Sequence, residues 1–185
     1  MIEEILHQTE ERMEKSIDAL LREFHSIRAG KASPSFLEKV TVPYYGAPMA
    51  LSQVATITSP EPRLLVIQPW EQSLLKEVEK AILKANLGVT PQSDGRVVRV
   101  AFPPLTQERR RELAKMAKKM AEDGKVELRT HRRVANEELK KLKDAGKISE
   151  DEQKSTLEKV QKMLDRYIEK VEDALAKKEQ QILEV

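Results

Sequence analysis

The chain has 185 residues, enough for one domain of moderate size or for two small ones. With 35% charged and 4% aromatic side chains, its composition favours long solvated helices over β-sandwiches or β-barrels. It contains no cysteine, which excludes disulfides, thiolate chemistry and cysteine-based metal sites. The net charge is +2. No apolar run approaches the roughly 20 residues of a membrane helix, and the N-terminus lacks a secretion signal, so we expect a cytoplasmic protein.

The first predicted element is an amphipathic helix that begins near the N-terminus and ends at Gly30. Its apolar stripe recurs at helical spacing: Leu6, Met13, Ile17, Leu20, Leu21, Phe24 and Ile27. A helix cannot easily continue past this point because Pro34 restricts the backbone of Ser33.

Residues 31–104 have a different character, with five of the seven aromatic residues and several short runs of Val, Ile and Thr. These runs predict strands near residues 40–42, 54–58, 64–67 and 97–102. Turns are predicted at Tyr45-Gly46 and Asp94-Gly95. One helix is predicted over residues 71–85, with a natural stop at Leu87-Gly88. This segment therefore predicts a compact α+β module.

After this module the helical pattern resumes in two long segments. Thr106 is a good N-cap for a helix that runs to about Ala145 and is closed by Gly146. A third helix begins at a capping box formed by Ser149 and Glu152. Its predicted buried seam is spaced three and four residues apart: Leu157, Val160, Leu164, Tyr167, Val171 and Leu175.

Three amphipathic helices bury their apolar stripes most economically against one another. We therefore expect an α+β fold in which residues 1–29 and 106–185 form an elongated antiparallel three-helix bundle. Residues 30–105 would form an inserted, mostly β, α+β domain. Its two connectors, with Gly in one and a Pro pair in the other, predict a hinge of restricted range, although the prolines could equally stiffen the joint. The expected hinge residues are Ala29, Gly30, Lys31, Pro103, Pro104 and Leu105.

Charge is distributed unevenly along this plan. Residues 107–133 contain ten basic and five acidic side chains, whereas residues 1–28 contain four basic and seven acidic ones. At about 100° per residue, seven of the basic groups of the second helix fall within roughly 60° of one direction, opposite its apolar residues. This basic stripe consists of Arg111, Lys115, Lys118, Lys125, Arg129, Arg132 and Arg133.

The basic stripe has two interpretations. It could be a solvated face that pairs with acids of the first and third helices. However, it points away from the expected core, and arginine, which suits bidentate phosphate contacts, outnumbers lysine at its C-terminal end. We therefore favour a surface for RNA or another polyanion. A helical adaptor for acidic proteins is the alternative, because the same stripe would serve it.

The sequence contains no pattern of residues that is typical of an enzyme active site. Gly30-Lys31 does not complete a P-loop, which would need Gly and Ser or Thr where His25 and Ala32 stand. His131 projects to the apolar side of the second helix, so we expect a packed, hydrogen-bonded histidine. The aromatic residues of the module could stack on bases. With so few of them in the chain, we expect that Tyr44, Tyr45 and Trp70 instead build the module's core.

Several short motifs, in order along nearly the whole chain, resemble those of the bacterial ribosome recycling factor family. They are Arg28-Ala29-Gly30-Lys31-Ala32-Ser33-Pro34, Tyr44-Tyr45-Gly46, Leu51, Gln53, Ala55, Ile57, Asn86-Leu87-Gly88, Pro91, Gly95, Pro104-Leu105-Thr106-Gln107-Glu108-Arg109-Arg110, Arg129, Arg132-Arg133 and Ile148-Ser149-Glu150-Asp151. The resemblance implies a bundle and a hinged α+β domain in an L-like shape. It implies a monomer without catalytic residues, cofactor or metal, which enters the ribosome after termination and splits the subunits with elongation factor G and GTP.

In that family the bundle contacts large-subunit ribosomal RNA, and the GTPase is thought to push on the inserted domain. Arg129 and Arg132 match positions implicated in RNA binding, and we add Arg28, from the first motif, to the candidate residues. The chain departs from the family's pattern beside these arginines. Thr130 and Val134 stand where members usually carry Asn and Asp, so local support of the arginine side chains differs.

Overall fold

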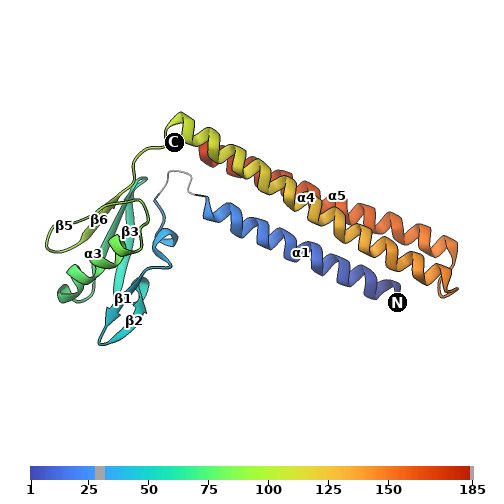
Figure 1. Cartoon of the computed structure of the whole chain (residues 1–185), viewed down its shortest axis with the longest axis horizontal. Helices are drawn as coiled ribbons and strands as arrows, with labels where there is room; N and C mark the ends of the chain where they lie inside the picture. The colour runs from blue at the N-terminus through green and yellow to red at the C-terminus, as the bar shows by residue number, and fades with distance from the viewer. Residues whose placement is uncertain (28–31, 184–185) are drawn as a thin grey trace. The chain divides into compact units, whose positions relative to one another are not determined.

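The computed structural model describes residues 1–27 and 32–183, which divide into two compact units (Figure 1). One unit contains residues 1–27 and 106–183, and the other contains residues 32–105. Arg28 and three of the predicted hinge residues, Ala29, Gly30 and Lys31, lie outside the described residues. Within the described part of the chain, no helix is long and apolar enough to cross a membrane.

The first unit is a bundle of three helices: α1 (Ile2–Ser26), α4 (Gln107–Asp144) and α5 (Glu150–Leu183). Helix α4 packs against both others and runs antiparallel to them (Figure 1). The predicted α+β fold with a three-helix bundle is thus confirmed. Both predicted helix starts are present, because Thr106 Oγ1 accepts from Arg109 N at 3.1 Å, and Ser149 N and Glu152 Oε2 lie 2.7 Å apart in the capping box.

The apolar stripe of α1 is buried for most of its length, including Met13, Leu20 and Phe24. The sequence prediction was wrong for Leu21, which is 46% exposed. Leu21 lines a groove between α1 and α5, where its side chain is only partly covered. On α5 the predicted seam is also found, since Val160, Leu164, Tyr167 and Val171 are buried. Its end members Leu157 and Leu175 are half-buried.

Helix α1 ends at Ser26, before the predicted stop at Gly30. Ile27 already has an extended backbone, with φ −75° and ψ 114°. Its carbonyl accepts a hydrogen bond from the buried amino group of Lys178, with Nζ 2.8 Å from the oxygen. Lys178 of α5 therefore satisfies a helix-terminal carbonyl that has no partner within α1. Burial lowers the pKa of this lysine.

Helices α1 and α4 approach closely at Gly124. A Cβ atom added there would lie 3.3 Å from Leu20 Cδ2. We expect the Gly124→Leu variant to lose about 1 to 3 kcal/mol of unfolding free energy, because a larger side chain would force α1 outward. Urea unfolding followed by circular dichroism would measure the loss. Exchange of the exposed Val126 for Leu on the same helix should change stability by less than about 0.5 kcal/mol.

A polar contact also joins α1 to α4. Ser16 Oγ donates to Glu127 Oε1 at 2.9 Å and lies 2.9 Å from His131 Nε2. The predicted packed, hydrogen-bonded state of His131 is thus confirmed. Burial lowers the pKa of the His131 imidazole, and the nearby Arg12 also lowers it, whereas Glu127 raises it. The neutral imidazole is therefore the form that the folded bundle favours.

This lowered pKa predicts that the bundle loses stability in weak acid. The unfolded chain takes up a proton at about pH 6.5, above the pKa of His131 in the folded state, so unfolding binds protons as the pH falls below neutrality. The stability advantage of the wild type over His131→Gln should therefore be larger at pH 7.5 than at pH 5. Urea titrations at both pH values would test this. An equal advantage at both pH values would contradict the prediction.

The second unit contains a four-stranded antiparallel sheet in the order β3-β4-β6-β5 and a separate β1-β2 hairpin (Figure 1). The strands are β1 (Thr41–Tyr44), β2 (Ala47–Ala50), β3 (Ala55–Glu61), β4 (Leu64–Pro69), β5 (Pro91–Ser93) and β6 (Val98–Ala101). The helical segments are α2 (Leu51–Val54), α3 (Leu75–Lys84) and the short 3-10 helices Pro34–Leu37 and Gln72–Leu74.

Together with the buried Phe102, aliphatic side chains make up the core of this unit, among them Leu65, Ile67, Val78, Ile82 and Val98. They come from β4, α3 and β6. The prediction that all three aromatic residues build this core was wrong. Trp70 is 67% exposed and Tyr45 is 86% exposed, while Tyr44 packs partly against the core.

Candidate nucleic-acid interface

The register of α4 separates its buried and charged faces. Its buried residues recur at intervals of four and seven: Leu113, Ala117, Ala121, Leu128, Ala135 and Leu139. The seven residues of the basic stripe lie on the same helix but off this buried face. The structure divides them into an outward group and a group that borders α5.

The outward group consists of Arg111, Lys115, Arg129 and Arg133, all of which are exposed. Among the described residues, none of the four forms an ion pair or hydrogen bond through its side chain. From Arg111 to Arg133 the helix rises by about 33 Å. This surface therefore offers a row of uncompensated positive charges, which is suited to an extended polyanion.

Two lysines of the stripe form ion pairs with α5. Lys118 Nζ lies 3.8 Å from Glu179 Oε1, and Lys125 Nζ lies 3.4 Å from Glu172 Oε1. Lys125 also pairs with Glu122 of its own helix at 3.4 Å, and its side chain is only 14% exposed. The expectation that the stripe lies beyond the reach of neighbouring acids is thus wrong for these two residues.

Arg132 is held in a chain of hydrogen bonds that sequence reasoning missed. Its Nη1 donates to Gln161 Oε1 at 2.8 Å, and Gln161 Nε2 donates to Asp165 Oδ1 at 2.9 Å. The four-residue spacing of Gln161 and Asp165 on α5 was the available signal. These bonds restrain the guanidinium, so its side chain has little rotational freedom left to lose in a further contact.

Thr130 and Val134, which follow Arg129 and Arg133 directly in the sequence, carry no charge. Thr130 Oγ1 donates to Val126 O within α4 at 3.0 Å. Val134 is half-buried and apolar. Thr130 and Val134 therefore offer the arginines no carboxylate or amide side chain.

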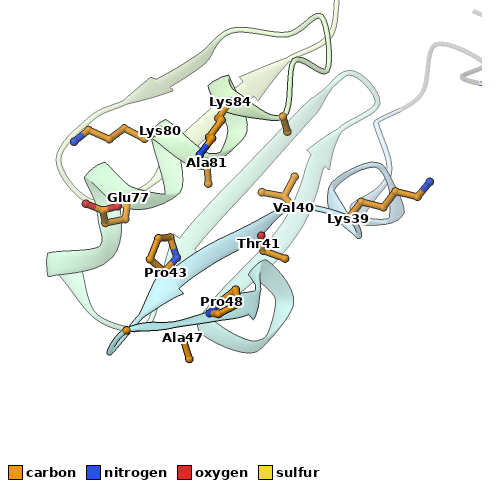
Figure 2. Close-up of a pocket in the computed structure, with 12 residues that line it drawn as sticks. Lys39, Val40, Thr41, Pro43, Ala47, Pro48, Glu77, Lys80, Ala81 and Lys84 are labelled. Carbon is orange, nitrogen blue, oxygen red and sulfur yellow. The ribbon is translucent and has the colours of Figure 1, made fainter.

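A groove of about 630 Å³ lies between the β1-β2 hairpin and α3 in the second unit. Small apolar side chains such as Val40, Pro43 and Ala81 line it, and Figure 2 shows Lys39 and Lys80 extending outward at its edges. Its lining contains one carboxylate, that of Glu77, and no histidine. Elsewhere in the described chain, no cluster of three or more His, Asp or Glu side chains is arranged to hold a metal ion.

The fold is a three-helix bundle that carries a row of exposed basic side chains, together with a second, separately packed α+β unit. The sequence profile of the ribosome recycling factor family matches residues 20–183. The ribosome-recycling factors of Bacillus licheniformis and Heliobacterium modesticaldum are 51% and 54% identical to the chain, with full coverage of both chains in each comparison. The chain belongs to the ribosome recycling factor family.

Solved structures agree with this assignment. A solution structure of the ribosome recycling factor is 38% identical, covers 100% of this chain and 98% of its own, and superposes with a TM-score of 0.80. A second similar structure is the T. thermophilus ribosome recycling factor, described with E. coli elongation factor G bound to the E. coli post-termination complex. It is 41% identical over 99% of both chains, with a TM-score of 0.64.

Proposed function

We propose that this protein recycles ribosomes. It binds the post-termination ribosome through large-subunit ribosomal RNA and, with elongation factor G and GTP, promotes dissociation into subunits. Family membership supports this proposal, as does the relative described on a post-termination complex with elongation factor G. The observation that carries the RNA-binding part is the outward group on α4, whose four basic side chains have no partner among the described residues.

The proposed RNA-binding residues differ in role. Members of the outward group contact phosphates directly, because their charges are exposed and uncompensated. Arg132 presents a guanidinium restrained by Gln161. Lys118 and Lys125 add to the local potential, although their ion pairs with α5 weaken them as ligands. The complete proposed set is Arg28, Arg111, Lys115, Lys118, Lys125, Arg129, Arg132 and Arg133.

The two units have different tasks in this proposal. The bundle anchors the protein on RNA as a passive, non-catalytic monomer in the cytoplasm. Elongation factor G supplies the work, which reaches the subunit interface through the second unit. The proposed hinge consists of Ala29, Gly30, Lys31, Pro103, Pro104 and Leu105. The last three lie in the irregular segment between β6 and α4, where both prolines are exposed.

Co-sedimentation with purified large subunits across a salt series tests the anchoring step. The logarithm of the binding constant should fall linearly with the logarithm of the salt concentration, by a slope of about 0.7 to 0.9 for each phosphate contact. A splitting assay on post-termination ribosomes with elongation factor G and GTP tests the activity itself. Binding that is insensitive to salt would show that the basic stripe does not anchor the protein on RNA. An absence of splitting would contradict the proposed function.

A further inference from the structure

Three aromatic residues and one carboxylate form a continuous surface on the second unit. This aromatic patch consists of Tyr44, Tyr45, Trp70 and Glu71. The rings of Tyr44 and Tyr45 meet edge to face with centroids 4.5 Å apart, and Tyr44 Oη donates to Glu71 Oε1 at 3.0 Å. A cavity of about 120 Å³ lies within the patch, lined by Tyr44, Gln53, Val54, Trp70 and Glu71.

The ring of Trp70 is fixed in place although its face is exposed. Its Nε1 donates to Thr56 Oγ1 at 3.1 Å, and its backbone N donates to Val54 O at 3.0 Å. The polar atom of the side chain is therefore already satisfied, while the apolar ring is left in water. Exposed tryptophan and tyrosine rings that are held rigid are typical of binding surfaces, because little conformational entropy is lost when a partner covers them.

Tyr45 occupies a backbone conformation that does not suit it. Tyr44 pairs with Ala47, so Tyr45 and Gly46 form a two-residue hairpin turn, with φ of +48° and +82°. Such turns favour Asn or Gly at both positions, and a bulky residue with positive φ is strained. Because its side chain is 86% exposed, core packing does not compensate for this strain. A strained, exposed residue points to a role in function.

The charge of the patch indicates the kind of partner. Glu71 is the only charged residue among the patch and the cavity lining, so the surface does not attract phosphate. A carboxylate beside the exposed Trp70 ring and the half-buried Tyr44 ring suits an arginine or lysine side chain, which can pair with the carboxylate and lie over a ring. The cavity has room for one such side chain. Surface arginines are common anchors in protein interfaces.

We infer that the aromatic patch docks a protein partner that presents a basic side chain during ribosome splitting. The inference rests on the proposed function, because it places the docking event within recycling. It assigns RNA contact to the bundle and protein contact to the second unit. The partner is thereby defined by its chemistry as a protein surface that inserts an arginine or lysine between Trp70 and Tyr44, against Glu71.

The Tyr45→Asn variant separates folding from docking. Relief of the strained turn should raise the unfolding midpoint of the second unit by about 2 to 4 °C, which the fluorescence of Trp70, the only tryptophan of the chain, reports directly. The same variant should bind large subunits as the wild type does but split post-termination ribosomes at least tenfold more slowly. Glu71→Gln keeps an acceptor for Tyr44 and removes the charge, and it should also slow splitting severalfold. Leu83→Ala, at an exposed site on α3 outside the patch, is the matched control.

Photo-crosslinking identifies what covers the patch. Tyr45→p-benzoylphenylalanine, mixed with purified post-termination ribosomes and elongation factor G, should crosslink to a protein, and Leu83→p-benzoylphenylalanine should give less product. Three outcomes would each overturn the inference. Position 45 could crosslink to ribosomal RNA, or the Tyr45→Asn and Glu71→Gln variants could both split ribosomes at the wild-type rate. The third outcome is that a variant loses splitting only when its unfolding midpoint is also lowered. If the wild type itself fails to split ribosomes, the proposed function fails instead.

Discussion

Replacing Arg129 and Arg133 together with alanine should lower the affinity for large ribosomal subunits by about ten- to a hundredfold at moderate salt. Both side chains are exposed, and neither has a partner among the described residues. Their removal therefore deletes phosphate contacts without breaking any interaction within the bundle. If each arginine neutralises one phosphate, the slope of the log–log salt plot should fall by about 1.4 to 1.8.

Controls can separate this effect from a general loss of positive charge. Arg22→Ala removes an exposed arginine from α1, and it should leave the slope nearly unchanged. Arg132→Ala should reduce the slope by the value of one contact, about 0.7 to 0.9. Lys125→Ala should change it less, because this lysine already pairs with Glu122 and Glu172. A double variant at positions 129 and 133 with wild-type affinity and slope would show that the outward group does not bind the RNA.

The helices could be predicted from the sequence because their signals are local. The stripe of α1, the Thr106 cap and the Ser149 capping box each depend on residues within a few positions of one another. The residue at which α1 ends was harder to predict from the sequence. Its early stop at Ser26 involves Lys178, which is distant in sequence and satisfies the carbonyl of Ile27.

The sequence predicted that the basic stripe lies on one face of a helix, but it did not predict which side chains of other helices contact the stripe. Periodicity fixes where Lys118 and Lys125 lie around α4, whereas their pairing depends on how α5 packs beside it. Glu172 and Glu179 reach the stripe only because the two helices lie side by side. Sequence reasoning therefore overestimated the number of free charges on this surface.

The strands of the second unit were only partly predictable. Strands β2 and β5 were missed because each contains proline and lacks β-branched residues. The exposed positions of Trp70 and Tyr45 were missed for a different reason. Because the chain has few aromatic residues, we expected them in the core, but most of the core is aliphatic and, of the aromatic residues in this unit, only Phe102 is fully buried. The turn signal at Tyr45-Gly46 already indicated exposure at the tip of the hairpin.

Deleting the second unit should abolish recycling while leaving RNA anchoring intact. In this variant a short Gly-Ser linker replaces residues 32–104. The bundle should remain folded, because residues 1–27 and 106–183 form a compact unit of their own. We expect its affinity for large subunits to stay within about threefold of the wild type and its salt slope to be unchanged, since the outward group remains on α4.

Splitting with elongation factor G and GTP should fall at least about 100-fold, which corresponds to about 2.7 kcal/mol in activation free energy. The comparison requires ribosomes saturated with the shortened chain, so that weaker binding cannot account for the loss, and circular dichroism should verify its helical content. Residual splitting near the wild-type rate would show that occupancy by the bundle is sufficient, and the proposed transmission through the second unit would then be wrong. If splitting is lost while binding is retained, the bundle is responsible for RNA anchoring and the second unit for transmitting the action of elongation factor G. This follows because a change confined to residues 32–104 cannot remove any charge of the outward group.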